Sequence, residues 1–168
     1  MAILPQLSIM PIKKMYQWIH KSASEDVAIL VAASYDTACI EYPTNSHIEI
    51  FDDIDFECLG RSFTMAQARN YAEYIKSLPP STQTFICACN AGESRSAALC
   101  AALCEYYNVD SSWIWDSPHY HPNMLVFDLF TQALGLKISD MQKDSLFFRN
   151  KQAFTHAISQ ARVNQTST

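Results

Sequence analysis

The sequence is poor in glycine and carries no excess of positive charge. Only three of its 168 residues are glycine, and six are cysteine. Such a composition is not typical of a small disulfide-stapled domain, so we expect the cysteines to be reduced thiols. The formal net charge of −5 provides no basic field, which argues against nucleic acid or an anionic membrane surface as a partner.

Long apolar runs are also missing. The first 14 residues mix prolines and lysines with apolar side chains and lack the uninterrupted apolar stretch of a signal peptide or membrane span. We therefore expect a cytoplasmic protein with no membrane partner. The 49% hydrophobic content suits one domain over residues 1–162. The polar residues 163–168 are expected to form a disordered tail.

The pattern along the chain alternates between strands and helices. Apolar and β-branched runs predict strands at residues 6–10, 27–33, 47–51 and 84–89. Helical spacing predicts helices at 13–21, from Arg95 onward, at 122–134 and, more weakly, at 144–162. A further helix is predicted to begin at a capping box formed by Thr64 and Gln67 and to end before Pro79. This order predicts an α/β fold with a mostly parallel central sheet flanked by helices.

The turn between the strand ending at Cys89 and the helix beginning at Arg95 is a candidate anion site. Parallel sheets bind ligands at the carboxyl ends of their strands. The turn presents successive backbone N–H groups, Gly92 relieves the backbone of Cβ constraint, and the helix N-terminus adds donors and a positive dipole end. A tetrahedral oxyanion is expected to bind Asn90, Ala91, Gly92, Glu93, Ser94 and Arg95.

Three side chains of this segment suit phosphoryl transfer. Cys89 is the candidate nucleophile, because the helix dipole and Arg95 both favour its thiolate. Arg95 can contact two phosphoryl oxygens at once and stabilise the transition state. Ser96 can donate its hydroxyl to the sulfur, which would make Cys89 a better leaving group in a second step.

Cys89, Gly92, Arg95 and Ser96 resemble the C-x-x-G-x-x-R-[ST] loop of dual-specificity-like protein tyrosine phosphatases. The segment 50–55 resembles the acid-bearing segment of small bacterial-type members, and 120–123 with the following apolar helix resembles their C-terminal region. The resemblance implies a protein tyrosine phosphatase-like fold. It also implies an enzyme that hydrolyses either a phosphorylated protein or a small phosphoester. A protein phosphatase of this kind would be specific for phosphotyrosine or have dual specificity. The reaction would pass through a cysteinyl-phosphate and need no metal or cofactor.

The resemblance further implies an aspartic acid upstream of the loop, which protonates the leaving oxygen and then serves as base for water. Asp53 is the first choice, because it ends the strand at the position that small bacterial-type members use. Asp55 is the second choice, because its separation from the cysteine is closer to that in the larger tyrosine phosphatases. The sequence leaves both open.

Two residues depart from the family pattern. Ala88 stands where the family usually has histidine, and Glu93 places a carboxylate inside a loop that would hold a dianion. These departures leave open a pseudophosphatase that binds phosphorylated partners without turnover. A rhodanese-like or arsenate-reductase-like thiol enzyme is a third possibility.

The remaining cysteines of this region are predicted to be core residues. Cys87 and Cys89 are expected on opposite faces of their strand, and Cys100 and Cys104 are four residues apart on an Ala/Leu helix, so a metal site is not favoured.

Overall fold

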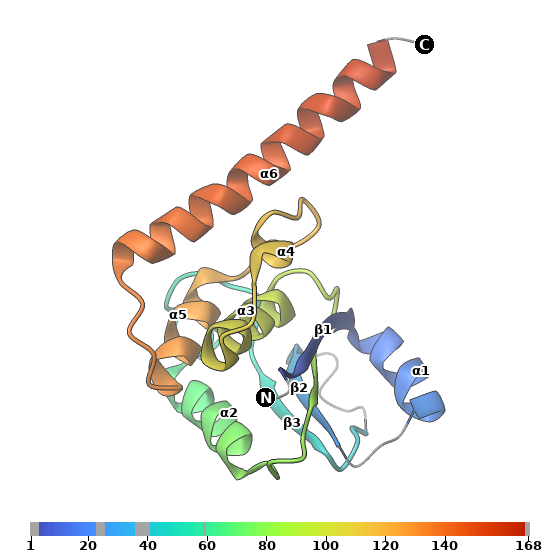
Figure 1. Cartoon of the computed structure of the whole chain (residues 1–168), viewed down its shortest axis with the longest axis vertical. Coiled ribbons are helices and arrows are strands. Elements are labelled where there is room, and N and C mark those ends of the chain that lie inside the picture. Colours follow the sequence, from blue (N-terminus) through green and yellow to red (C-terminus); the bar gives the residue numbers. More distant parts are fainter. Residues whose placement is uncertain (1–3, 23–25, 36–40, 59, 167–168) are drawn as a thin grey trace.

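The computed structural model describes residues 4–22, 26–35, 41–58 and 60–166 and centres on a four-stranded sheet (Figure 1). The strand order is β1-β4-β2-β3, and every neighbouring pair is parallel. The expected α/β class with a parallel sheet is therefore confirmed. The strands are β1 (Gln6–Pro11), β2 (Val27–Ala33), β3 (Ser46–Ile50) and β4 (Thr84–Cys89).

Strand β4 lies inside the sheet, between β1 and β2. Its residues from Phe85 to Cys89 are buried, as is all of β2, which is the pattern of parallel strands covered on both faces. The register places Pro11 of β1 and Ala32 of β2 beside Cys89. The sheet thus carries Cys89 at the carboxyl end of an interior strand.

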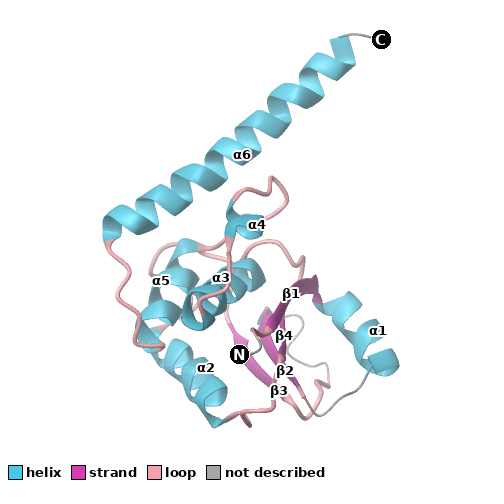
Figure 2. Cartoon of the chain, viewed as in Figure 1, coloured by secondary structure: helices cyan, strands magenta, loops and turns pink. Residues whose placement is uncertain are grey.

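Helices cover both faces of the sheet (Figures 1 and 2). The helix α1 (Ile12–Ser22) packs on one face through Ile12 and Met15. The core on the other face includes residues from α2 (Met65–Ser77), α3 (Arg95–Tyr107), α4 (Ser112–Trp115) and α5 (Met124–Ala133). The capping box of α2 at Thr64 and Gln67 is present as predicted.

Side chains along β4 alternate between the two faces. Phe85, Cys87 and Cys89 point toward α3, whereas Ile86 and Ala88 point toward α1. The expectation that Cys87 and Cys89 would lie on opposite faces is wrong, because residues two apart on a strand point the same way.

The expected core role of the other thiols is confirmed. Cys87, Cys100 and Cys104 are fully buried. Burial raises the pKa of Cys100, and a hydrogen bond with Cys100, together with burial, raises the pKa of Cys104. Cys100 and Cys104 therefore stay protonated and unreactive at neutral pH.

Helix α6 (Asp140–Thr166) begins beside the body of the molecule, and its later turns extend away from it (Figure 1). It begins four residues earlier than predicted because Ser139 and Gln142 form a second capping box. The helix includes residues 163–166 of the expected tail, and Ser167 and Thr168 lie outside the described residues. Within the described segments, no helix combines the length and apolar character needed to cross a bilayer.

Candidate active site

The loop from Cys89 to Arg95 surrounds the Cys89 sulfur with polar groups. Cys89 is 2% exposed. The backbone N–H of Gly92 donates to Sγ at 3.3 Å, and the hydroxyl oxygen of Ser96 lies 3.0 Å from Sγ. The sulfur therefore has a backbone N–H and a hydroxyl group within hydrogen-bond distance.

Gly92 is required at its position for two reasons. Its φ is +76°, in the left-handed region that residues with a side chain rarely adopt. A Cβ atom there would lie 2.5 Å from the backbone nitrogen of Pro11 and 2.7 Å from the carbonyl carbon of Met10. The loop is thus pressed against the end of β1, and only glycine allows that approach.

Arg95 extends from the first turn of α3 beneath the loop and is 4% exposed. Its Nη1 donates to the backbone oxygen of Phe51 at 2.7 Å, and its Cζ lies 5.8 Å from the centre of the Phe51 ring. Its buried Nε has no hydrogen-bond partner among the described residues. A buried guanidinium N–H without a partner favours an anionic ligand at this point.

The segment 50–55, which carries the candidate acids, is hydrogen-bonded directly to the loop. Asp53 Oδ1 accepts hydrogen bonds from the Ser94 hydroxyl at 2.8 Å and from Asn123 Nδ2 at 2.9 Å. Asp55 lines the same adjoining pocket as Asp53. Both candidate acids therefore lie near the loop, and Asp53 accepts a hydrogen bond from it.

Asn123 also contacts the candidate acid Asp53, although no sequence motif gives it a role in the chemistry. Its Nδ2 also donates to the backbone oxygen of Ile54 at 3.1 Å, and its Oδ1 accepts from the backbone N–H of Val126 at 3.1 Å, which caps α5. An asparagine before an apolar helix is a recognised N-cap signal. That signal predicts the cap but not the contact with Asp53, which lies 70 residues earlier in the chain.

The turn at 121–123 braces the loop through its backbone. The N–H of His121 donates to the Glu93 oxygen at 2.9 Å, and the N–H of Asn123 donates to the Ser94 oxygen at 3.4 Å. The Ser94 side chain makes no capping bond to α3, and its hydroxyl donates to Asp53. The first N–H groups of α3 are therefore not satisfied by that hydroxyl.

The other predicted phosphate-binding residues lie along this turn. Asn90 and Ala91 are exposed, and Glu93 is half-buried. Ala88, the residue before the nucleophile, is fully buried among apolar side chains on the α1 face of the sheet. This environment accounts for its small apolar side chain.

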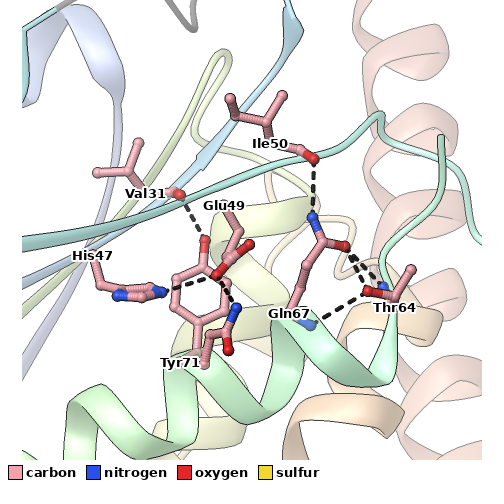
Figure 3. A network of polar contacts seen from close by, with 8 residues as sticks. Val31, His47, Glu49, Ile50, Thr64, Gln67 and Tyr71 are labelled. Carbon is pink, nitrogen blue, oxygen red and sulfur yellow. Dashed lines mark hydrogen bonds and ion pairs between the residues drawn. The ribbon is translucent and has the colours of Figure 1, made fainter. Parts of the chain in front are cut away.

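A second network fixes the strand end that leads into the acid-bearing segment (Figure 3). Gln67 accepts the backbone N–H of Thr64 through Oε1 at 3.0 Å, and its Nε2 donates to the Ile50 oxygen at 2.9 Å. The next residue, Phe51, accepts the hydrogen bond from Arg95. The N-terminus of α2 thus helps to position the backbone that holds Arg95 and precedes Asp53.

A pocket of 450 Å³ adjoins the loop. Asp53, Asp55 and Ser94 line it next to the loop. Its lining also includes His121 and Pro122 of the turn before α5, Met124 at the start of α5, and Phe147, Lys151 and Phe154 of α6. The α6 residues gave no functional signal in the sequence.

Neither a family model nor a curated protein matches the sequence. Among solved structures, the chain is similar to PTPMT1 in complex with PI(5)P, with 13% identity, a TM-score of 0.40 and coverage of 90% of this chain and 94% of that one. The chain is also similar to PTPMT1 alone, with 16% identity, a TM-score of 0.42 and coverage of 92% of this chain and 95% of that one. A third similar structure is the core catalytic domain of the PP-IP phosphatase SIW14 from S. cerevisiae in complex with citrate. The identity is 14%, the TM-score is 0.38, and the match covers 96% of each chain. Similarities this low assign neither family nor function.

Proposed function

We propose that the chain is a protein tyrosine phosphatase-like enzyme that hydrolyses phosphomonoesters through Cys89. The observation that carries this proposal is that three groups meet at one loop. They are the buried sulfur of Cys89, Arg95 with its unpartnered Nε, and the Asp53 carboxylate, which is hydrogen-bonded to the loop. A chance Cys-x5-Arg spacing would not bring these groups together at the carboxyl end of an interior strand.

In the first step, the Cys89 thiolate attacks phosphorus and the ester oxygen leaves with a proton from an aspartic acid. Arg95 and the loop N–H groups hold the phosphoryl oxygens as charge develops on them. In the second step, the aspartate takes a proton from water, whose oxygen attacks the cysteinyl-phosphate. Phosphate leaves and the thiolate is restored, with Ser96 stabilising the sulfur as it departs.

We assign the acid and base role to Asp53. Its bonds to Ser94 and Asn123 tie its carboxylate to the phosphate loop. A proton donor must lie within reach of the leaving oxygen, and geometry is the first criterion for that role. Asp55, which lines the same pocket, is the second candidate.

The substrate that we propose is either phosphotyrosine or a small aryl phosphate. With phosphotyrosine as substrate, the enzyme would be a tyrosine-specific or dual-specificity protein phosphatase. A pseudophosphatase that binds phosphorylated partners without turnover is the second candidate. The half-buried Glu93 carboxylate in the loop favours that candidate, because a carboxylate near the anion would oppose the dianion.

Turnover of p-nitrophenyl phosphate by the purified protein under reducing conditions tests the proposal. We expect hydrolysis that is inhibited by vanadate and abolished in Cys89→Ser, because a hydroxyl with no adjacent base is a much weaker nucleophile than a thiolate. Cys58→Ser is the matched control, since Cys58 is a half-buried thiol whose backbone contacts Ser62. Hydrolysis retained in Cys89→Ser would rule out the mechanism. A wild type that binds phosphate without turnover would favour the pseudophosphatase.

A further inference from the structure

Helix α6 lies outside the sequence motifs that resemble the phosphatase family, yet some of its residues line the pocket beside the loop. Phe147, Lys151 and Phe154 line the pocket from α6, and Asp53 and Ser94 line it from the loop side. Because Ser94 belongs to the loop and Asp53 is bonded to it, a group attached to a phosphate held by the loop has this pocket as its neighbour.

The first turns of α6 are anchored to the body by polar contacts. Asn150 is 7% exposed although it is an amide, because its Nδ2 donates to three backbone oxygens. Arg149 forms a two-pronged ion pair with Asp116. These anchors fix the helix where its aromatic residues line the pocket. The three oxygens belong to Trp115 at 3.3 Å, Ser117 at 3.3 Å and Tyr120 at 2.9 Å.

Two aromatic rings of α6 remain about half exposed beside the loop. Phe147 is 42% exposed and Phe154 is 44% exposed, and their separation of seven residues places them on one side of the helix. The Phe154 ring meets the His121 ring edge-on, with centroids 4.9 Å apart. Lys151 Nζ lies 4.3 Å from the centre of the Phe147 ring. The rings are held in place and still offer apolar surface to a ligand.

The chemistry of the pocket favours an aromatic group over a second phosphate. A flat ring could pack against Phe154 and Phe147 and remove their surface from water. A second phosphate would meet the Asp55 carboxylate and the carboxyl group of Asp53, which line the same pocket. Lys151 also lines the pocket, with its ammonium over the Phe147 ring, so the lining offers one lysine against two carboxyl groups and does not favour a polyanion.

Building on the proposed function, we propose that Phe147 and Phe154 of α6 form an aryl subsite that makes the site selective for aromatic phosphomonoesters over alkyl ones. The loop binds the phosphate, and α6 recognises what the phosphate is attached to. The helix thereby determines substrate specificity without contributing to the phosphoryl transfer itself.

The test compares the binding of phenylphosphonate with that of methylphosphonate, which share the anion and are not hydrolysed. We expect the wild type to prefer phenylphosphonate and Phe154→Ala to lose about tenfold in that preference, the scale of one lost aromatic contact. Methylphosphonate binding should not change. In turnover, Phe154→Ala should raise KM for phenyl phosphate with little change in kcat.

Ile158→Ala is the matched control, because Ile158 is 39% exposed one turn further along α6 and does not line the pocket. An unchanged preference in Phe154→Ala would overturn the subsite, as would tighter binding of methylenediphosphonate than of phenylphosphonate. Either result could occur with full catalytic turnover, which would leave the proposed function standing. Conversely, aryl preference without any turnover would support the subsite and reject the enzyme. Failure to bind either phosphonate would overturn the subsite, and only its combination with no turnover of p-nitrophenyl phosphate would overturn both.

Discussion

The loop at the end of β4 and the helix α6 meet at the same pocket but are held in place by different means. The loop is enclosed by packing, since Gly92 lies against β1 and Arg95 to Cys104 of α3 are buried. Helix α6 is largely exposed and is anchored through Asn150, a partly buried Leu146 and surface ion pairs. Rigid packing thus supports the chemistry, and a more weakly held element supplies the surface that a substrate would meet.

The largest expected effect concerns an exposed carboxyl group that is hydrogen-bonded to the loop. We expect Asp53→Asn to lower turnover of phenyl phosphate by about 10²–10⁴-fold, because the proton donor is lost while the amide oxygen can still accept from Ser94. The loss should be smaller with p-nitrophenyl phosphate, whose leaving group departs readily without a proton. Steady-state kinetics on both substrates measures the difference.

Asp55→Asn is the control for that prediction, because Asp55 lines the same pocket. A loss that depends on the leaving group in Asp55→Asn, with none in Asp53→Asn, would transfer the acid role to Asp55.

The second prediction tests how tightly the loop is packed. Gly92→Ala should lower the free energy of unfolding by about 2–5 kcal/mol, because it combines a left-handed backbone position with a clash against Pro11. In Gly135→Ala, φ is +83° but a Cβ would meet nothing within 4 Å, so only the backbone cost of about 1–2 kcal/mol applies. Denaturant unfolding measures both, and equal losses would show that the approach to β1 is not tight.

The same contrast explains what could be predicted from the sequence. The structure of residues 84–104 is predictable from the sequence, because an apolar strand, a glycine turn and an Ala/Leu helix each carry a local signal of burial. The positions of Asp53 and Asn123 depend on hydrogen bonds between distant segments, which no local pattern encodes. The start of α6 was missed although Ser139 and Gln142 carry a capping pattern. Its contribution to the pocket depends on Asn150 meeting backbone oxygens of another segment, and periodicity cannot reveal that.

The third prediction concerns the anchor of α6. Asn150→Ala should cost about 1–3 kcal/mol of stability, because a buried donor to three backbone oxygens is removed. It should also weaken the preference for phenylphosphonate by loosening Phe147 and Phe154, while methylphosphonate binding is retained. Gln152→Ala, at an exposed position on the same helix, is the control. An unchanged melting temperature together with unchanged aryl preference would show that Asn150 does not anchor the helix.

The smallest expected effect depends on pH and concerns the exposed ion pair that supports the same anchor. The hydrogen bond from Arg149 lowers the pKa of Asp116, with a weaker opposing influence of Asp110. Because the folded-state pKa is lowered, the ionised carboxylate stabilises the folded protein above the unfolded-state value near 4 and loses that contribution as pH falls through the lowered value. Asp116→Asn should therefore melt at a slightly lower temperature than the wild type at pH 7, and the difference should disappear in acid. Taking the difference between the two proteins cancels the titration of shared groups that do not interact with Asp116 or Arg149. A melting difference that stays constant from pH 7 into acid would show that the pair with Arg149 does not stabilise the docked helix through charge.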